Sequence, residues 1–389
     1  TGGSSVVTIT GPSTTQPNIV SFSVPSPAPS PGIETIGITA SFPSGQTNGC
    51  TQAGASCTAT TSITATYEGT LWVPDHGGAD IFGFPLPITN NEAPTYSLSV
   101  ASPEAIAVDA NGNVFSDSEN ATNGTFEEFA SPNFGVTVTN SNGGVTNYNM
   151  VVAPNGDAAV GGANATLLFT PPYSGTPTLL QNGSVNAVAV DSSSTFYAGY
   201  SNNSVTSYPA PYISTGYTVT ASGTINGMLV SGNKLFVGEN SSIDVFALPL
   251  TSTSTPEATI AIATNLGEYF YGLDVDSSGN LWVAAFDGGT SAQGGLLEYK
   301  TPFSTGESPS VTLSAPFGSD TSSNAYGLAI DGNNNVYVAT YAGGASGGAI
   351  LQFNAPVTTS STPAVVIDTP NFSKLTNLTL SAPKLVVSL

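Results

Sequence analysis

The sequence predicts an all-β protein folded as an eight-bladed β-propeller, with seven blades as the fallback count. Three observations predict it: a repeated unit of short strands, the spacing of its copies, and two chain ends that complement each other. The clearest copy of the unit is residues 325–353, AYGLAIDGNNNVYVATYAGGASGGAILQF. Two alternating apolar runs flank the polar turn Asp331–Asn335, and a third run follows a Gly/Ala/Ser loop. Period-2 apolarity between Asp, Asn and Gly turns is typical of strands packed on one another.

The second strand of this unit recurs along the whole chain. Its copies begin at Thr70, Asn113, Asp157, Thr195, Lys234, Asn280, Asn335 and Lys384. They are spaced by about 37–55 residues, the range expected for four-stranded propeller blades. The first strand of several copies ends in a short acidic side chain, at Asp109, Asp191, Asp276 and Asp331. Because Asp at this place can accept hydrogen bonds from turn amides, we interpret these four residues as structural.

The two chain ends look like complementary parts of one blade. Residues 375–389 match the first two strands of the repeat, and residues 18–40 match the last two. Neither part can satisfy its edge alone, but joined side by side they would form a shared blade that closes the ring. The sequence therefore predicts an extended arm at residues 1–17 and a single propeller at residues 18–389, with a Cys-containing loop at residues 43–61.

The charge of the chain excludes several kinds of partner. Of 389 residues only 7% are charged, with no Arg, four Lys and 25 acidic residues, so the net charge is −21. Nucleic-acid binding depends on Lys and Arg neutralising phosphates, so nucleic acid is not an expected partner. An anionic membrane surface is disfavoured for the same reason. No run of about 18 apolar residues occurs, so membrane insertion is not expected either.

Several features favour an extracellular protein. The chain begins at Thr1 with no signal-like segment, which is what removal of a secretion signal would leave. Cys50 and Cys57 lie in one Gly/Ser/Thr-rich loop and are predicted to form a small disulfide ring, because a metal site would need two more soft ligands nearby. Candidate N-glycosylation sites are Asn120, Asn123, Asn164, Asn182, Asn202, Asn240, Asn371 and Asn377.

Two repeat copies resemble NHL-type β-propeller repeats. They are YGLDVDSSGNLWVAAF at residues 271–286 and YGLAIDGNNNVYVATY at residues 326–341. Each runs from Gly through an aliphatic pair and Asp to a Gly/Asn turn and an aromatic-plus-Val strand. The resemblance covers about 350 residues and implies the propeller fold. The family includes relatives of lactonases, antibiotic lyases and binding scaffolds, so the resemblance does not select one activity.

We find no catalytic constellation and no convincing cofactor site. His76 is the only histidine, and with Asp75 and Asp80 it could act as a metal ligand or general base, but a polar rim-loop role fits better because no second histidine can complete a site. Acidic residues that follow strand two would share one face of the ring, where they could hold Ca²⁺. The rim candidates are Asp75, Asp117, Glu239 and Asp287. No tandem calcium-binding spacing supports them, so no cofactor is predicted.

Aromatic residues fall into two groups. Trp72 and Trp282 occupy equivalent strand-two positions and are expected in the core between blades. A second set is expected nearer the channel mouth: Tyr269, Tyr271, Tyr326 and Tyr341. Aromatic side chains with Asn and carboxylates suit a glycan, but tyrosines at repeat-equivalent positions are more often core residues.

The function predicted from the sequence is a non-enzymatic extracellular scaffold that self-assembles, as a filament or surface-layer subunit. The β-prone segment Ser5, Val6, Val7, Thr8, Ile9 and Thr10 lies outside the predicted ring and could add a strand to a neighbouring subunit. Two alternatives remain open at this point: a glycan-binding lectin or adhesin that uses the channel mouth, and a lyase or lactonase resembling other propeller family members.

Overall fold

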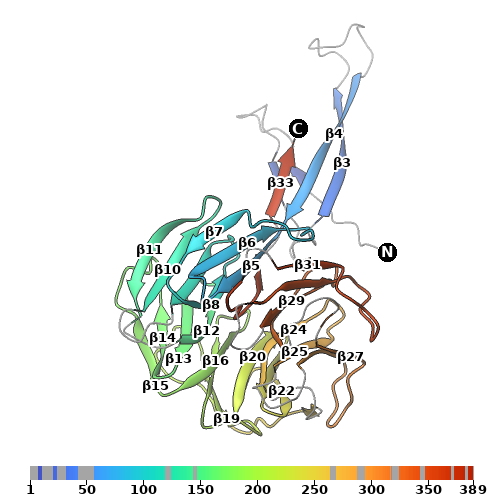
Figure 1. The fold of residues 1–389 in the computed structure, drawn as a ribbon. Coiled ribbons are helices and arrows are strands. Elements are labelled where there is room, and N and C mark those ends of the chain that lie inside the picture. The colour runs from blue at the N-terminus through green and yellow to red at the C-terminus, as the bar shows by residue number, and fades with distance from the viewer. Residues whose placement is uncertain are drawn as a thin grey trace. The chain divides into compact units, whose positions relative to one another are not determined.

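The computed structural model describes residues 8–10, 21–23, 32–42, 57–118, 124–142, 147–262, 269–286, 294–315, 317, 324–341, 347–368, 372–381 and 384–388. These residues form two compact units, one of Thr1–Gly69 with Pro383–Leu389 and one of Thr70–Ala382. Both units are built from strands (Figure 1). Among the described residues there is no helix, and hence none long and apolar enough to cross a membrane.

The second unit contains, within its described residues, seven four-stranded antiparallel sheets. From innermost to outermost strand they are β32 (Thr379–Leu380), β5 (Thr70–Asp75), β6 (Asp80–Pro85) and β7 (Tyr96–Ser99); β8 (Pro103–Val108), β9 (Val114–Ser118), β10 (Thr125–Ala130) and β11 (Gly135–Ser141); β12 (Asn147–Val152), β13 (Ala158–Gly162), β14 (Ala165–Phe169) and β15 (Thr178–Asn182); β16 (Val185–Val190), β17 (Phe196–Tyr200), β18 (Ser204–Tyr208) and β19 (Thr218–Thr220); β20 (Ile225–Ser231), β21 (Lys234–Glu239), β22 (Ser242–Ala247) and β23 (Ala258–Ala261); β24 (Tyr269–Val275), β25 (Leu281–Phe286), β26 (Gly295–Tyr299) and β27 (Val311–Ser314); β28 (Asn324–Ile330), β29 (Val336–Tyr341), β30 (Ile350–Phe353) and β31 (Val365–Ile367).

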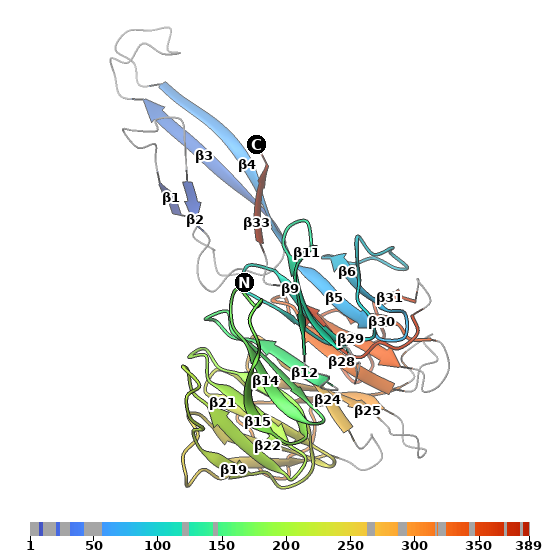
Figure 2. The same cartoon turned by 90° about the vertical axis from the view of Figure 1, so that its left-hand side faces the viewer.

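The seven sheets are the blades of a closed β-propeller. Each innermost strand contacts the next one, from β8 through β12, β16, β20, β24 and β28 to β32, and β32 contacts β8 again. Figure 1 shows the inner strands nearest the centre of this unit, and Figure 2 shows its blades from the side. The predicted all-β propeller is therefore confirmed, with seven blades, the fallback count.

The eighth, shared blade is not formed. The ring is closed instead by β32, where Thr379 pairs with Trp72 and Leu380 with Leu71. The run at residues 384–388, predicted as a blade strand, is β33 of the other unit. The closing blade thus takes one strand from the C-terminal part of the chain and three from residues 70–99, rather than two from each chain end.

The other unit contains two strands, β3 (Gly32–Phe42) and β4 (Cys57–Glu68), that are longer than any strand of a blade. β3 pairs along its whole length with β4, and β33 (Lys384–Ser388) pairs with the last part of β4. A second, two-stranded sheet joins β1 (Thr8–Thr10) to β2 (Ser21–Ser23). The eleven-residue pairing of β3 with β4 satisfies backbone groups that the predicted shared blade would have satisfied. The propeller consequently begins at Thr70, whereas the sequence placed its start at residue 18.

The core lies between neighbouring blades. Trp72 is fully buried and packs on Tyr96 and Phe134, with ring centroids 5.5 and 4.8 Å away. Trp282 is also buried, in the cluster between the blades of β24 and β28. Both tryptophans therefore have the core role that their equivalent positions predicted. Such rings bury large apolar areas and stabilise the blade interfaces.

The four acidic residues after strand one hold their turns as predicted. Asp331 Oδ1 accepts the backbone N–H groups of Asn333 and Asn335, both at 2.9 Å. Asp109 Oδ1 accepts those of Asn111 and Asn113, at 2.9 and 2.8 Å. Corresponding pairs of bonds reach Asp191 and Asp276. A short carboxylate satisfies two turn amides in each case, which explains why Asp recurs there.

Candidate functional site: a pocket in the central channel

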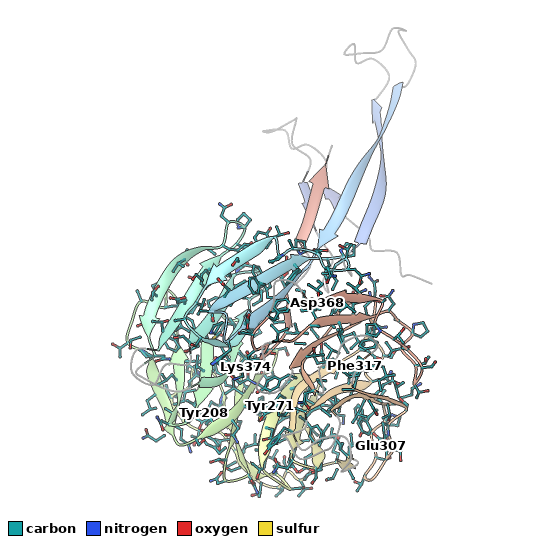
Figure 3. All side chains as sticks on the ribbon, viewed as in Figure 1. Tyr208, Tyr271, Glu307, Phe317, Asp368 and Lys374 are labelled. Atoms are coloured by element: carbon teal, nitrogen blue, oxygen red, sulfur yellow. The ribbon has the colours of Figure 1, made fainter. Side chains whose placement is uncertain are left out.

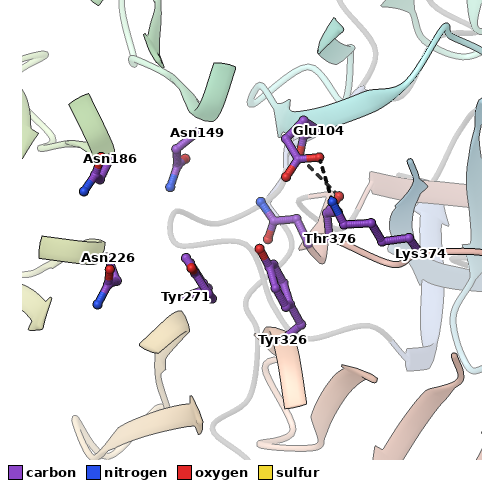
Figure 4. A pocket seen from close by; sticks show the side chains of 9 residues that line it. Glu104, Asn149, Asn186, Asn226, Tyr271, Tyr326, Lys374 and Thr376 are labelled. Carbon is purple, nitrogen blue, oxygen red and sulfur yellow. Dashed lines mark hydrogen bonds and ion pairs between the residues drawn. The ribbon is translucent and has the colours of Figure 1, made fainter. Parts of the chain in front are cut away.

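A pocket of about 330 Å³ lies where the inner strands meet. Every blade lines it with an inner-strand side chain or with the segment leading into the inner strand. The lining residues are Glu104, Asn149, Asn186, Asn226, Tyr271, Tyr326, Lys374, Thr376 and Asn377. Figure 3 shows Tyr271 and Lys374 close to the middle of the ring, and Figure 4 shows the lining side chains.

β-bulges bring these side chains to the pocket. In each blade from β8 to β28 the pairing of the inner strand with the second strand shifts register once. The residues skipped at the shifts include Glu104, Asn186, Asn226, Tyr271 and Tyr326. A bulge re-aims a side chain and ends regular pairing, and bulges are common next to functional sites. One irregularity repeated around the ring therefore supplies most of the pocket.

In the blades of β20 and β28 a glycine directly follows the residue that lines the pocket. This glycine lets neighbouring inner strands approach closely. A Cβ built on Gly227 would lie 2.4 Å from the carbonyl oxygen of Phe270, in the next blade. A Cβ on Gly327 would lie 2.7 Å from the carbonyl carbon of Asn377. Both are backbone atoms that cannot move aside without disturbing the adjoining strand. These glycines keep the channel narrow and place the lining side chains of successive blades next to one another.

One side of the pocket is made of amides. Asn186 donates from Nδ2 to the carbonyl of Ile225 at 2.8 Å, and Asn226 donates from Nδ2 to Asn240 Oδ1 at 2.7 Å. Asn149 lies on the same side (Figure 4). Each amide carries two N–H donors and an oxygen acceptor. The bonds named here use one donor each and fix the orientation of the side chain, so the amide still presents both donor and acceptor capacity.

Two tyrosines form an aromatic platform in the pocket. The rings of Tyr271 and Tyr326 stack at 4.6 Å between centroids with a 13° angle between their planes. Tyr269 stacks on Tyr271 at 5.9 Å, and Phe286 meets Tyr326 edge-on at 5.2 Å. Tyr271 is 37% exposed, an unusually high value for an aromatic residue of an inner strand. Tyr271 and Tyr326 thus lie at the channel, as predicted, and both line the pocket.

The side of the pocket opposite the amides carries a small cluster of charged and polar groups (Figure 4). Glu104 Oε2 lies 2.7 Å from His76 Nδ1 and 3.8 Å from Lys374 Nζ. Thr376 donates from Oγ1 to the backbone carbonyl of Glu104 at 3.3 Å (Figure 4). The sequence suggested that His76 stands alone on the rim, but the structure places it in contact with Glu104. It belongs to a group that contacts the pocket.

Asp75 ties the ring-closing segment, residues 372–381, to the rest of the closing blade. Its carboxylate accepts hydrogen bonds from Ser373 N at 3.0 Å, Ser373 Oγ at 2.7 Å and Lys374 N at 2.8 Å. The next residue, His76, donates its backbone N–H to the carbonyl of Lys374 at 2.9 Å. Asp75 is 3% exposed, so these bonds are shielded from water. The contacts position Lys374, Thr376 and Asn377 at the pocket.

The structure does not bring the proposed calcium ligands together. Asp117 is buried and accepts a hydrogen bond from Asn142 Nδ2 at 2.7 Å. Glu239 accepts bonds from Ser222 N at 2.8 Å and Ser242 Oγ at 2.7 Å. Asp287 lies outside the described residues. Within the described part of the chain, no three metal-ligating side chains gather at one place.

Glu239 faces Asp244 across the backbone amide of Ser222, which donates to both carboxylates. Burial, followed by the neighbouring charge of Asp244, raises the pKa of Glu239 from 4.5 to about 7. Between pH 4.5 and about pH 7 the carboxyl group of Glu239 is deprotonated in the unfolded chain and protonated in the folded chain. The contribution of Glu239 to stability therefore falls as the pH rises through this window, and the loss is complete above pH 7.

We expect Glu239→Gln to remove this loss, because an amide carries no ionisable proton. Between pH 5 and pH 8 the unfolding free energy of the wild type should fall by roughly 2 kcal/mol more than that of the variant. Urea titrations at several pH values measure the difference. Glu257→Gln, at an exposed position paired with Lys234, is the control and should leave the pH profile unchanged. Parallel profiles for the wild type and Glu239→Gln would contradict the assignment.

The other predicted sites are only partly described. Asn164, Asn182, Asn202 and Asn240 are exposed, whereas Asn377 lines the pocket; Asn120, Asn123 and Asn371 lie outside the described residues. The disulfide prediction also falls outside, since Cys50 and the side chain of Cys57 are not described. Of the predicted assembly segment, residues 8–10 form β1 and pair with β2 of the same chain, and residues 5–7 are not described.

Most pocket residues were missed by sequence reasoning, although a signal for them exists. Glu104, Asn186, Tyr271 and Tyr326 each precede the turn aspartate of their blade by five residues. Those aspartates predict turns, and the same alignment places one pocket residue near the start of each of these inner strands. Lys374 and Thr376 carry no such signal, because the closing segment lacks the turn aspartate.

No family model and no curated protein matches this chain. Solved structures do match. A functionally unknown protein from Desulfotomaculum acetoxidans has a TM-score of 0.60 at 12% identity, covering 81% of this chain and 99% of its own. The virginiamycin B lyase of Staphylococcus aureus has a TM-score of 0.53 at 13% identity, covering 72% and 90%. The β-propeller domain of Cps50 (Swd1) from Myceliophteria thermophila has a TM-score of 0.56 at 12% identity, covering 72% and 89%.

The fold and the comparisons together define the class of the protein: it is a seven-bladed β-propeller. At identities of 12–13% the similarity shows the fold alone. One of these proteins is a lyase and one is functionally unknown, so any functional conclusion has to come from the channel pocket itself.

Proposed function

We propose that the protein is a carbohydrate-binding propeller that holds a hydroxyl-rich ligand in its channel pocket. The observation that carries the proposal is the pairing of an amide wall with an aromatic platform. Asn149, Asn186 and Asn226 form the wall, and the stacked rings of Tyr271 and Tyr326 form the platform. The pocket, at about 330 Å³, lies at the small end of the range for ligand sites, about 300–1,000 Å³, and suits one or two sugar rings.

The chemistry of these side chains matches that of a sugar. A hydroxyl group both donates and accepts hydrogen bonds, and so does each amide of the wall. One face of a pyranose ring exposes C–H groups that pack on an aromatic ring. Tyr271 is 37% exposed, so part of its ring is open to the pocket, and its stacking on Tyr326 holds it in place. Because the three amides and two tyrosines come from inner strands and most of them are held by the contacts named above, the pocket is organised before a ligand arrives, which lowers the entropic cost of binding.

Binding without chemistry fits this pocket better than catalysis. Glycoside hydrolysis uses two carboxyl groups that flank the scissile bond. Glu104 is the only carboxylate among the lining residues of the pocket, and His76 and Lys374 already contact it. A lectin-like module is therefore the function that the geometry supports best.

A glycan array tests the proposal with the wild type and two tyrosine variants. We expect specific binding by the wild type and roughly three- to tenfold weaker binding by Tyr271→Ala, the loss expected for an aromatic contact. The matched control is Tyr217→Ala, at a 49% exposed tyrosine next to the outermost strand β19. It should bind like the wild type. An array with no specific signal, or equal loss in both variants, would refute the channel site.

Secretion, self-association and the NHL type of the repeats stay predictions of the sequence. One structural observation favours self-association: among the described residues the eleven-residue strand β3 pairs only with β4, so its other edge lacks a strand partner. Such an edge is a template for a strand of another molecule. Sedimentation velocity would test this, since a chain that stays monomeric at high concentration excludes assembly.

A further inference from the structure

Positive charge is scarce in this chain, and one of its four lysines, Lys374, lines the pocket. The sequence has four Lys, no Arg and one His against 25 acidic residues. Two of these five residues, Lys374 and His76, contact the same carboxylate, that of Glu104. A protein of net charge −21 repels anions from most of its surface. Lys374 therefore brings one of the few positive charges of the chain to the pocket.

The ammonium group of Lys374 is directed to the pocket but is weakly engaged. Its Nζ lies 3.8 Å from Glu104 Oε2, which is beyond hydrogen-bond distance, and its side chain is 32% exposed. Lys234 provides the comparison, because its ammonium contacts Glu257 directly. An ammonium carries three N–H donors. Among the described residues, the three N–H donors of the Lys374 ammonium are therefore available to a group inside the pocket.

The carboxylate of Glu104 is already in contact with His76. His76 Nδ1 lies 2.7 Å from Glu104 Oε2, and the carboxylate is only 11% exposed. Lys374 then adds a full positive charge on the side facing the cavity. With a neutral imidazole the cluster of Glu104, His76 and Lys374 has no net charge, and with a protonated one it is positive. An anionic group next to Lys374 gains a charge-assisted hydrogen bond.

We propose that the ligand is an acidic sugar of the hexuronate type, whose carboxylate binds Lys374. This inference rests on the proposed carbohydrate site and adds the class of sugar. The ring packs on Tyr271, the hydroxyls bond to the amides of Asn186 and Asn226, and the carboxylate reaches the opposite side of the pocket, where Lys374 stands (Figure 4).

Isothermal titration calorimetry with three matched sugars tests the inference: glucuronate, its methyl ester and glucose. Galacturonate is run beside them in case the site reads the C4 hydroxyl. We expect the uronate to bind about tenfold or more tightly than the ester and glucose, the gain typical of one charge-assisted hydrogen bond. Raising the salt concentration should weaken uronate binding and leave glucose binding nearly unchanged, because ions screen the attraction.

Lys374→Gln should remove the preference for the uronate and keep the weaker binding of glucose. Lys234→Gln, which alters a surface ion pair, should keep the preference. Equal affinity for uronate and ester, or a preference that survives Lys374→Gln, overturns the acidic-sugar inference while the carbohydrate site stands. Binding of none of these sugars, with a blank glycan array, overturns the carbohydrate site itself. The ester comparison uses the wild type, so it decides the question even if Lys374→Gln fails to fold.

Comparing the binding of a trimeric uronide with that of the monomer distinguishes two sources of such a sugar. Tighter binding of the trimer than of the monomer points to the chain end of an acidic polysaccharide. Equal or weaker binding of the trimer points to a free sugar acid. The carboxylate and the ammonium group make the same contact in both cases.

Discussion

A chain that ends before Phe372 should not form a stable propeller. The truncation removes β32, so the backbone edge of β5 at Leu71 and Trp72 loses its partner. It also removes Phe372, Leu375 and Leu378, which are at most 4% exposed in the core of the closing blade. Each lost apolar side chain of this size costs about 2–5 kcal/mol, and whole domains are stable by only about 5–15 kcal/mol. We expect aggregation or unfolding, measured by circular dichroism and size-exclusion chromatography.

A shorter truncation is the control. Removing Lys384–Leu389 takes away β33, which pairs with β4 in the other unit, and leaves the ring-closing segment intact. The melting transition of the propeller should then be unchanged. If the chain that ends before Phe372 stays monomeric and melts like the full-length protein, residues 372–381 do not close the ring and the seven-bladed arrangement is wrong.

Asp75→Ala should cause the next largest loss. The buried carboxylate accepts bonds from the backbone N–H groups of Ser373 and Lys374 and from the hydroxyl of Ser373. Alanine leaves these donors without an acceptor, and each unsatisfied buried donor costs about 1–3 kcal/mol. We expect a loss of about 2–4 kcal/mol in a urea titration. We also expect weaker sugar binding, because the segment that positions Lys374 is no longer held.

The matched control is Asp80→Ala, on the strand that pairs with Asp75. Asp80 lies opposite Asp75 in the β5–β6 register, and its side chain accepts one bond, from the exposed Ser97. Its removal should change the unfolding free energy by less than about 0.5 kcal/mol, the usual range at exposed positions. Equal effects of the two substitutions would show that Asp75 has no special part in closing the ring.

The repeat predicted the fold well because a blade is defined by local patterns. Alternating apolar residues predicted the strands, and the turn aspartates predicted the loops that their carboxylates hold, as at Asp331. The blade count was less certain, because the run at residues 384–388 has the pattern of a blade strand but pairs with β4. Choice between two possible partners depends on contacts distant in sequence, which a local pattern does not contain.

The site could be predicted only in part, for a related reason. Tyr271 and Tyr326 were placed near the channel because the repeat aligned them. The amides opposite them depend on β-bulges, which shift one residue without changing the alternating pattern. The group of His76, Glu104 and Lys374 joins residues from three separate parts of the sequence. Nothing near His76 in the sequence indicates that its partner is a glutamate of the following blade.

The most direct test of the channel site is a crystal structure of the protein soaked with the glycan that binds most tightly. We expect sugar density in the channel, with one ring packed on Tyr271 and hydroxyls within hydrogen-bond distance of Asn186 or Asn226. Sugar density on an outer blade surface, with only solvent between Tyr271 and the amides, would contradict it.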